Sequence, residues 1–219
     1  MNNYAVIFDM DGVIAHTNPY HAKAFEAFFD KYKIPYSDLE FEHHMYGKHN
    51  SYIMSHFFKK PIAGEELLQL ENEKEGLFRE IYKSQIKSIP HYVPFLDDLK
   101  ANGFKTGVAT SAPRANMDLV IDGLGIRPKM ESLLASENVA KHKPDPEVYL
   151  ISAQKLGIDP SRCVIFEDSF SGVSAAINAN MKVVGVLSSH TKEQLPPCDF
   201  YIEDYTEIDV SKILTILTK

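Results

Sequence analysis

The sequence lacks the features of a secreted, membrane-bound or zinc-binding protein. Only two of its 219 residues are cysteines, Cys163 and Cys198, and their spacing fits no metal motif. No apolar run approaches the roughly 18 residues needed to cross a bilayer. No cationic start precedes an apolar stretch, as it would in a signal peptide. We therefore expect a cytoplasmic protein that binds no membrane.

Basic residues are also scarce relative to acidic ones. The chain has 23 Lys and Arg against 30 Asp and Glu, a formal net charge of −7, and its basic residues form no block or stripe. This balance argues against nucleic acid as a partner. Walker A and G-x-G-x-x-G patterns are absent, which disfavours a nucleotide-binding role. Without internal repeats, the length suits one large domain or a core with a small insertion.

An apolar run from Tyr4 to Phe8 ends in the sequence Asp9-Met-Asp11-Gly12. Such a run is typical of a buried parallel strand, and ligands bind beyond the carboxyl ends of these strands. Asp9 would then lie at the edge of the sheet, and Gly12 would permit a turn that lets Asp11 face the same point. Because Asp and Gly are ordinary turn residues after any strand, the motif indicates little by itself.

Three further strand-like runs end in polar residues and lead into helices. In chain order, these residues are Thr110 and Ser111, then Lys143, then Glu167 and Asp168. Each has a simpler explanation, since hydroxyls and Asp cap helices and most lysines are solvated. Taken together, the four strand ends carry acids that suit Mg²⁺ and hydroxyls and an ammonium that suit an anion.

With these four motifs, the chain resembles the haloacid dehalogenase superfamily over essentially its whole length, and within it the β-phosphoglucomutase-like branch. The family motifs map onto Asp9 and Asp11, Thr110, Lys143, and Glu167 with Asp168. The resemblance implies an α/β fold with a doubly wound parallel sheet and an inserted small helical cap domain. Its substrate would be a small phosphorylated molecule.

The resemblance also implies a mechanism. Asp9 would attack phosphorus to form an aspartyl phosphate, while Asp11 would donate a proton to the leaving oxygen and then activate the acceptor. The implied cofactor is Mg²⁺, with ligands from Asp9, the Asp11 carbonyl, Glu167 and Asp168. The transferring oxygens would be held by Thr110, the Ser111 N–H and Lys143.

Helical spacing of apolar residues predominates between the first motif and the second. We therefore expect a helical cap at residues 15–87, inserted into a core made of residues 1–14 and 88–219. Pro90 and Pro94 interrupt the helical pattern and predict a returning linker over 88–94. In the second core segment, strand and helix patterns alternate, which predicts the parallel sheet independently of the resemblance.

The third expected cap helix, from about Glu65 to Tyr82, has Lys74 in its apolar stripe. Periodicity alone favours a lysine that extends its charged end into solvent. The resemblance instead aligns Lys74 with the cap lysine that contacts substrate phosphate. It also places Thr17 at the hinge and His21 on the active-site side of the cap.

The segment 46–51 matches the family's substrate-reading loop in position but differs in content. Asn50 stands where the mutase pattern has an arginine, and an amide has neither the charge nor the reach of a guanidinium. Lys48, His49 and Arg114 are the candidates to replace it. The substitution favours hydrolysis over mutase activity, because a mutase must hold a second phosphate.

We therefore expect a monomeric phosphatase of small phosphorylated metabolites such as sugar phosphates. The alternatives are β-phosphoglucomutase, if a sugar hydroxyl rather than water accepts the phosphoryl group, and inorganic pyrophosphatase. Two non-enzymatic alternatives use the same scaffold chemistry: a phosphoaccepting signalling switch and a catalytically silent binding protein. A signalling receiver takes its phosphoryl group on a mid-chain strand and has no cap, so the motif order disfavours it.

Overall fold

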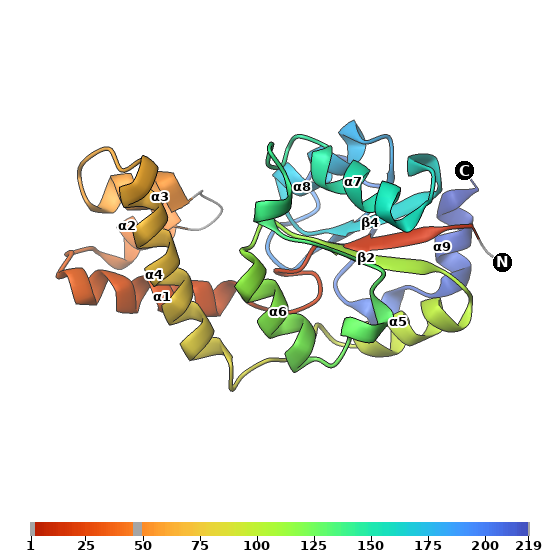
Figure 1. Ribbon diagram of the computed structural model, residues 1–219, viewed down its shortest axis with the longest axis horizontal. Coiled ribbons are helices and arrows are strands. Elements are labelled where there is room, and N and C mark those ends of the chain that lie inside the picture. Colours follow the sequence, from red (N-terminus) through yellow and green to blue (C-terminus); the bar gives the residue numbers. More distant parts are fainter. Residues whose placement is uncertain (1–2, 46–49, 219) are drawn as a thin grey trace. The chain divides into compact units, whose positions relative to one another are not determined.

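The computed structural model describes residues 3–45 and 50–218. The chain forms two compact units (Figure 1). One unit, called here the core unit, contains both ends of the chain, up to His16 and from Ile86 onward. The other, the inserted unit, is the segment Thr17–Gln85.

The core unit is built on a six-stranded sheet with the order β3-β2-β1-β4-β5-β6, in which all neighbours are parallel. The strands are β1 (Ala5–Phe8), β2 (Lys105–Ala109), β3 (Ser132–Leu134), β4 (Cys163–Glu167), β5 (Lys182–Val186) and β6 (Phe200–Ile202). Their continuous apolar runs reflect a sheet that is covered on both faces. The predicted α/β parallel sheet is confirmed.

Helices cover the two faces of this sheet. They are α5 (Tyr92–Ala101), α6 (Arg114–Gly123), α7 (Glu147–Leu156), α8 (Phe170–Asn178) and α9 (Val210–Leu217). Helix α7 packs on β1, β2 and β3, and α8 on β4 and β5, whereas α5 packs on β2 and α9 on β4. Figure 1 shows α7 and α8 on one face and α5 and α9 on the other.

The central strand β1 contributes to both layers of the core. Alternate side chains of a strand point to opposite faces, and Ala5 and Ile7 belong to the cluster that includes Tyr149 of α7. Phe8 points the other way and packs edge-on against Tyr92, with ring centroids 5.1 Å apart. This burial on both faces fixes the position of the residue that follows, which is Asp9.

The inserted unit consists of helices α1 (Asn18–Tyr32), α2 (Asp38–Met45), α3 (Asn50–Phe57) and α4 (Gly64–Tyr82). Its core is largely aromatic, with Phe25, Phe28 and Phe29 of α1 buried together with Phe41 and Phe57. The spacing of the α1 phenylalanines, at i, i+3 and i+4, is the one that places side chains on one helix face.

One prediction about local structure is wrong. The segment 88–94 is not a linker throughout, because α5 begins at Tyr92 and contains Pro94. Proline is tolerated in the first turn of a helix, where the backbone N–H has no partner within the helix. Within residues 3–45 and 50–218, no helix is long and apolar enough to span a membrane.

Candidate active site

The carboxyl ends of β1, β2 and β4 bring the first, second and fourth motifs together. Phe8 is in register with Val108 of β2 and Phe166 of β4, so Asp9 comes level with the last residues of both neighbours. The Asp9 N–H donates to the Phe166 carbonyl at 3.0 Å, which extends the strand pairing by one residue. Asp9 is buried, with 7% of its surface exposed.

Lys143 joins Asp9 to the fourth motif. Its Nζ lies 2.6 Å from Asp9 Oδ1, 2.6 Å from Glu167 Oε1 and 3.1 Å from the Ala109 carbonyl. The three protons of the ammonium therefore have three acceptors. The ammonium also lies 4.9 Å from the ring centroid of Tyr149. Lys143 is buried, so the general expectation of a solvated lysine does not hold here.

Glu167 is held on all sides by hydrogen bonds. Its Oε1 accepts from Lys143 and from the Tyr149 hydroxyl at 2.8 Å, and its Oε2 accepts from the N–H groups of Asp168 and Ser169 and from the Ser169 hydroxyl, each at 3.0 Å. A carboxylate offers about four lone-pair positions. Although burial opposes ionisation, these partners, with Lys143 foremost, lower the pKa of Glu167. The Glu167 carboxylate is therefore ionised, and both of its oxygens already accept hydrogen bonds.

Carboxylate oxygens of Asp9, Glu167 and Asp168 lie within 4.8 Å of one another. Burial raises the pKa of Asp168 to about 7, and the charge of Glu167 adds to the shift. Burial also raises the pKa of Asp9 well above its usual range, although Lys143 opposes this. When Asp9, Glu167 and Asp168 are all ionised, their three negative charges exceed the single positive charge of Lys143 by two. Such a cluster fits a divalent cation that prefers oxygen ligands, as Mg²⁺ does.

The turn after β1 places Asp11 near this cluster. Gly12 has φ of +75°, a conformation that side chains disfavour, and its N–H donates to the Ala15 carbonyl at 2.8 Å. A Cβ on Gly12 would lie 2.1 Å from Asp168 Oδ2. Glycine is therefore required here by the backbone conformation, as the sequence predicts, and also by the lack of space beside Asp168. Asp11 is half-buried, and its charge acts on both Asp9 and Asp168.

The second motif forms a turn rather than a direct helix cap. The Thr110 hydroxyl accepts from the Ala112 N–H at 3.0 Å, and α6 begins at Arg114 after Pro113. Thr110 is buried, whereas Ser111 is exposed. The Arg114 guanidinium donates to Asn138 and to the Leu133 carbonyl. These two partners lie in β3 and in the segment that follows it, not in the acidic cluster.

Within the inserted unit, Lys74 and His21 lie together. Lys74 is 2% exposed, and its Nζ is 3.0 Å from His21 Nδ1, 2.7 Å from Glu75 Oε1 and 4.4 Å from the Phe25 ring centroid. The His21 ring stacks on Phe78 at 3.9 Å. Periodicity alone suggests a solvated Lys74, but the structure buries its charged end beside a carboxylate and an imidazole.

The remaining residues predicted for the cap are less informative. Thr17 is fully buried and is the first residue of the inserted unit. Asn50 is the first residue of α3. Lys48 and His49 lie outside the described residues.

Comparison with known proteins identifies the family. The sequence matches the haloacid dehalogenase-like hydrolases over residues 6–186. The chain belongs to this family. It is 30% identical to the fructose-1-phosphate phosphatase YqaB of Escherichia coli, over 83% of this chain and 95% of that one.

Solved structures agree with this assignment. The crystal structure of a HAD hydrolase, family IA, variant 3, from Entamoeba histolytica is 26% identical, with a TM-score of 0.92 over 99% of this chain and 100% of the other. A β-phosphoglucomutase from Clostridium difficile is 25% identical, with a TM-score of 0.81 over 98% and 97%. This haloacid dehalogenase-like protein is therefore a phosphatase or phosphomutase, and the predicted resemblance is confirmed.

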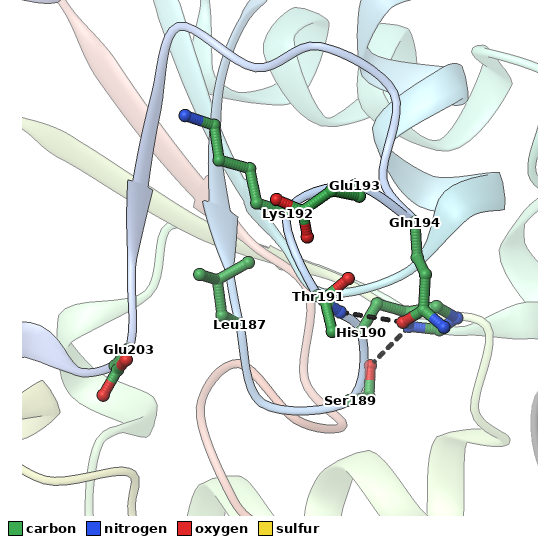
Figure 2. Close-up of a pocket in the computed structure, with 8 residues that line it drawn as sticks. All are labelled: Leu187, Ser189, His190, Thr191, Lys192, Glu193, Gln194 and Glu203. Carbon is green, nitrogen blue, oxygen red and sulfur yellow. Dashed lines mark hydrogen bonds between the residues drawn. The ribbon is translucent and has the colours of Figure 1, made fainter.

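Several residues around the hydrolase's acidic cluster escaped the sequence analysis. The hydroxyl of Tyr149, a residue of α7, donates a hydrogen bond to Glu167. The loop after β5 contacts Asp168 of the fourth motif through Ser188, Ser189 and His190. Ser189 and His190 also line a hollow of about 500 Å³, together with the residues up to Gln194 and with Glu203 after β6. Figure 2 shows these lining residues. The signal was present, because polar residues after the apolar run 183–186 repeat the pattern of the other strand ends. Tyr149 gives no such signal, since a tyrosine on a helix is ordinary.

Proposed function

We propose that this protein is a Mg²⁺-dependent phosphatase of small phosphorylated metabolites, sugar phosphates foremost, that works through an aspartyl phosphate on Asp9. The observation that carries the proposal is the position of Asp9. Its carboxylate follows a strand buried on both faces, and Lys143 holds one of its oxygens at 2.6 Å. A nucleophile fixed in this way needs little reorganisation to attack in line.

The reaction proceeds in two displacements on this proposal. An Asp9 oxygen forms a bond to phosphorus as the bond to the leaving oxygen breaks, and the carboxyl group of Asp11 gives that oxygen a proton. Asp11 then takes a proton from water, whose oxygen displaces Asp9 and releases inorganic phosphate. Thr110, the Ser111 N–H and Lys143 hold the phosphoryl oxygens and offset their charge.

Asp9, Asp168 and the Asp11 carbonyl are the groups proposed to hold Mg²⁺. When bound, the ion offsets the charge between the nucleophile and the phosphoryl group. Glu167 is less suited to direct ligation, because five hydrogen bonds already use its two oxygens. We assign it instead to holding Lys143 and the backbone of Asp168.

The proposed substrate class is supported by the relatives. The Escherichia coli relative, which is 30% identical to this chain, is named a fructose-1-phosphate phosphatase. We further propose that the inserted unit is the substrate-binding cap and that Lys74 is its cation. The enzyme would act as a cytoplasmic monomer.

A second candidate function is β-phosphoglucomutase, favoured by the likeness to the Clostridium difficile enzyme. The neutral Asn50 argues for hydrolysis, because the mutase pattern has an arginine there. A phosphorus NMR time course with Mg²⁺, β-glucose 1-phosphate and a trace of glucose 1,6-bisphosphate separates the two. Free phosphate supports the phosphatase, and glucose 6-phosphate without free phosphate supports the mutase. Fructose 1-phosphate and pyrophosphate are run in parallel.

The mechanism is tested with Asp9→Asn, which keeps the size of the side chain and removes the nucleophile. We expect loss of turnover in a variant that still folds, as shown by a cooperative thermal transition. Asp98→Asn, on an exposed position of α5, is the matched control and should retain full activity. Mg²⁺-dependent turnover by Asp9→Asn would disprove the aspartyl-phosphate mechanism.

A further inference from the structure

The loop after β5 contacts two of the segments that form the acidic cluster. Ser188, Ser189 and His190 come directly after the strand, separated from its last residue only by Leu187. Each of the three side chains has a partner in either the turn after β1 or the fourth motif. None of them belongs to the four family motifs on which the assignment rests.

Ser188 lies between the turn after β1 and Asp168. Its hydroxyl donates to the Gly12 carbonyl at 2.6 Å, and the same oxygen is 3.3 Å from Asp168 Oδ2. A Cβ on Gly12 would come within 2.8 Å of the Ser188 hydroxyl and 2.1 Å of Asp168 Oδ2. Ser188 and Asp168 therefore lie so close to Gly12 that this position has no room for a side chain.

Ser189 and His190 hold the backbone of the same aspartate. The Ser189 hydroxyl donates to the Asp168 carbonyl at 2.9 Å, and His190 Nδ1 lies 3.0 Å from that oxygen. The two side chains are also 2.8 Å from each other, as Figure 2 shows. Asp168 is thus held at its carbonyl by one pair of residues, and its carboxylate lies 3.3 Å from the Ser188 hydroxyl.

We propose that Ser188 is a positioning residue that sets the separation between the Asp9–Gly12 turn and the Asp168 carboxylate, and so sets the affinity for Mg²⁺. The inference rests on the proposed function, in which Asp9, the Asp11 carbonyl and Asp168 bind the ion. Ligands from two separate segments bind an ion well only if their spacing is held. Hydrogen bonds that orient ligands change metal affinity by about 10–100-fold when removed.

The test is calorimetric titration of Mg²⁺ into the full chain without substrate. Ser188→Ala removes the bridge, and we expect its dissociation constant for Mg²⁺ to rise about tenfold or more. Ser188→Thr keeps the hydroxyl and should stay within about threefold of the wild type. Ser174→Ala is the matched control, because it also removes a serine hydroxyl bonded to a backbone carbonyl, that of Phe170, and should bind Mg²⁺ as the wild type does.

Steady-state rates supply a second readout. In Ser188→Ala, the Mg²⁺ concentration for half-maximal rate should rise in step with the dissociation constant, while the rate at saturating Mg²⁺ recovers most of the wild-type value. A residue that only stabilised the fold would lower the melting temperature in EDTA without moving the Mg²⁺ titration. Ser189→Ala is measured as well, in case Ser188→Ala does not fold. It leaves the hydrogen bond from Ser188 to Gly12 in place but removes the one to the Asp168 carbonyl. We therefore expect it to weaken Mg²⁺ binding by a smaller factor.

The possible results distinguish a failure of the Ser188 positioning role from a failure of the proposed phosphatase function. If the wild type binds Mg²⁺ and folded Ser188→Ala binds it equally well, the positioning role is wrong and the proposed function stands. If the wild type shows no Mg²⁺ binding and no Mg²⁺-dependent turnover on any phosphomonoester, the proposed function fails and this inference fails with it.

Discussion

Lys143 in the core unit and Lys74 in the inserted unit are both buried, but their surroundings differ in charge. Lys143 contacts two carboxylates at 2.6 Å, and a third belongs to the same cluster. Lys74 contacts one carboxylate, at 2.7 Å, together with an imidazole and an aromatic ring. Negative charge therefore exceeds positive charge around Lys143, whereas one carboxylate balances the charge of Lys74.

This difference indicates opposite tasks for the same residue type. The excess of negative over positive charge around Lys143 favours the binding of a cation. Lys74 instead contacts the Glu75 carboxylate and the His21 ring, so its described contacts carry less negative charge than those of Lys143. This favours an anion as its ligand, as the proposed cap function requires. Burial of a lysine therefore does not define its role, and the groups around it do.

The largest expected effect comes from removing each lysine in turn. Lys143→Met leaves Asp9 and Glu167 without a counter-charge, and breaking such a buried pair costs about 3–5 kcal/mol of stability. We also expect turnover to fall by at least about 10²–10³-fold. Lys74→Met removes the counter-charge of one carboxylate, that of Glu75, rather than of two, so it should destabilise less and act mainly by raising KM. Urea unfolding and steady-state kinetics measure both.

A double variant makes this comparison sharper. Lys74→Met with Glu75→Gln removes both members of the pair and should recover much of the stability lost in Lys74→Met alone. Equal losses of stability in Lys143→Met and Lys74→Met would contradict the difference in charge on which the comparison rests.

The second prediction concerns pH and Mg²⁺ in the core unit. The pKa of Asp168 is raised to about 7, while the unfolded chain releases this proton near pH 4. Between these values the folded state binds more protons than the unfolded state, so stability falls as pH rises. In EDTA, the melting temperature should therefore decrease from pH 5 to pH 8. Mg²⁺ replaces the proton, so its stabilising effect should grow over the same range.

Thermal melts at several pH values, with EDTA or with Mg²⁺, measure this dependence. Asp168→Asn should reduce the growth of the Mg²⁺ effect with pH, because its side chain has no proton to lose. Lys74→Met, in the inserted unit, should leave it unchanged. A Mg²⁺ effect in the wild type that does not vary between pH 5 and pH 8 would show that the cluster is not the binding site.

Prediction from the sequence was most successful for the residues at strand ends. Asp9, Glu167 and Asp168 lie together because parallel strands end at one edge of the sheet, a consequence of fold class. Lys143 follows no strand directly, because β3 ends at Leu134 and Lys143 lies in the segment before α7. The sequence does not predict how Lys143 divides its three protons, since the acceptors are the Asp9 and Glu167 carboxylates and the Ala109 backbone carbonyl, from three separate segments. The resemblance implies Glu167 as a Mg²⁺ ligand, and this stays a prediction; the supporting role that we propose instead rests on its five hydrogen bonds.

Predictions for the inserted unit were less complete for a physical reason. Helical periodicity identifies which face is buried, and Lys74 lies on that face. It does not say whether the ammonium reaches solvent or finds a partner, because the partners come from α1 and from the neighbouring Glu75. Pro94 misled in a similar way, since a proline that ends one helix is equally suited to begin another.

The last prediction compares one helical glycine from each unit. Gly172 of α8 faces Glu167 so closely that a Cβ would lie 1.7 Å from Oε1. Gly172→Ala must therefore displace the carboxylate that holds Lys143, and we expect a loss of about 1–3 kcal/mol with reduced turnover. Gly76 of α4 has its nearest side-chain atom 3.9 Å from the same position. Gly76→Ala should instead stabilise by up to about 1 kcal/mol, since alanine restricts the unfolded chain more than glycine does.

Chemical unfolding of the two alanine variants tests this contrast, and activity at saturating Mg²⁺ locates its cause. If displacement of Glu167 is the cause, Gly172→Ala should lose turnover even at temperatures far below its transition. Gly76→Ala should keep wild-type turnover throughout. A Gly172→Ala variant that unfolds earlier but turns over normally when folded would mean that the contact between α8 and Glu167 serves stability alone, and that Lys143 is held adequately by Asp9 and the Ala109 carbonyl.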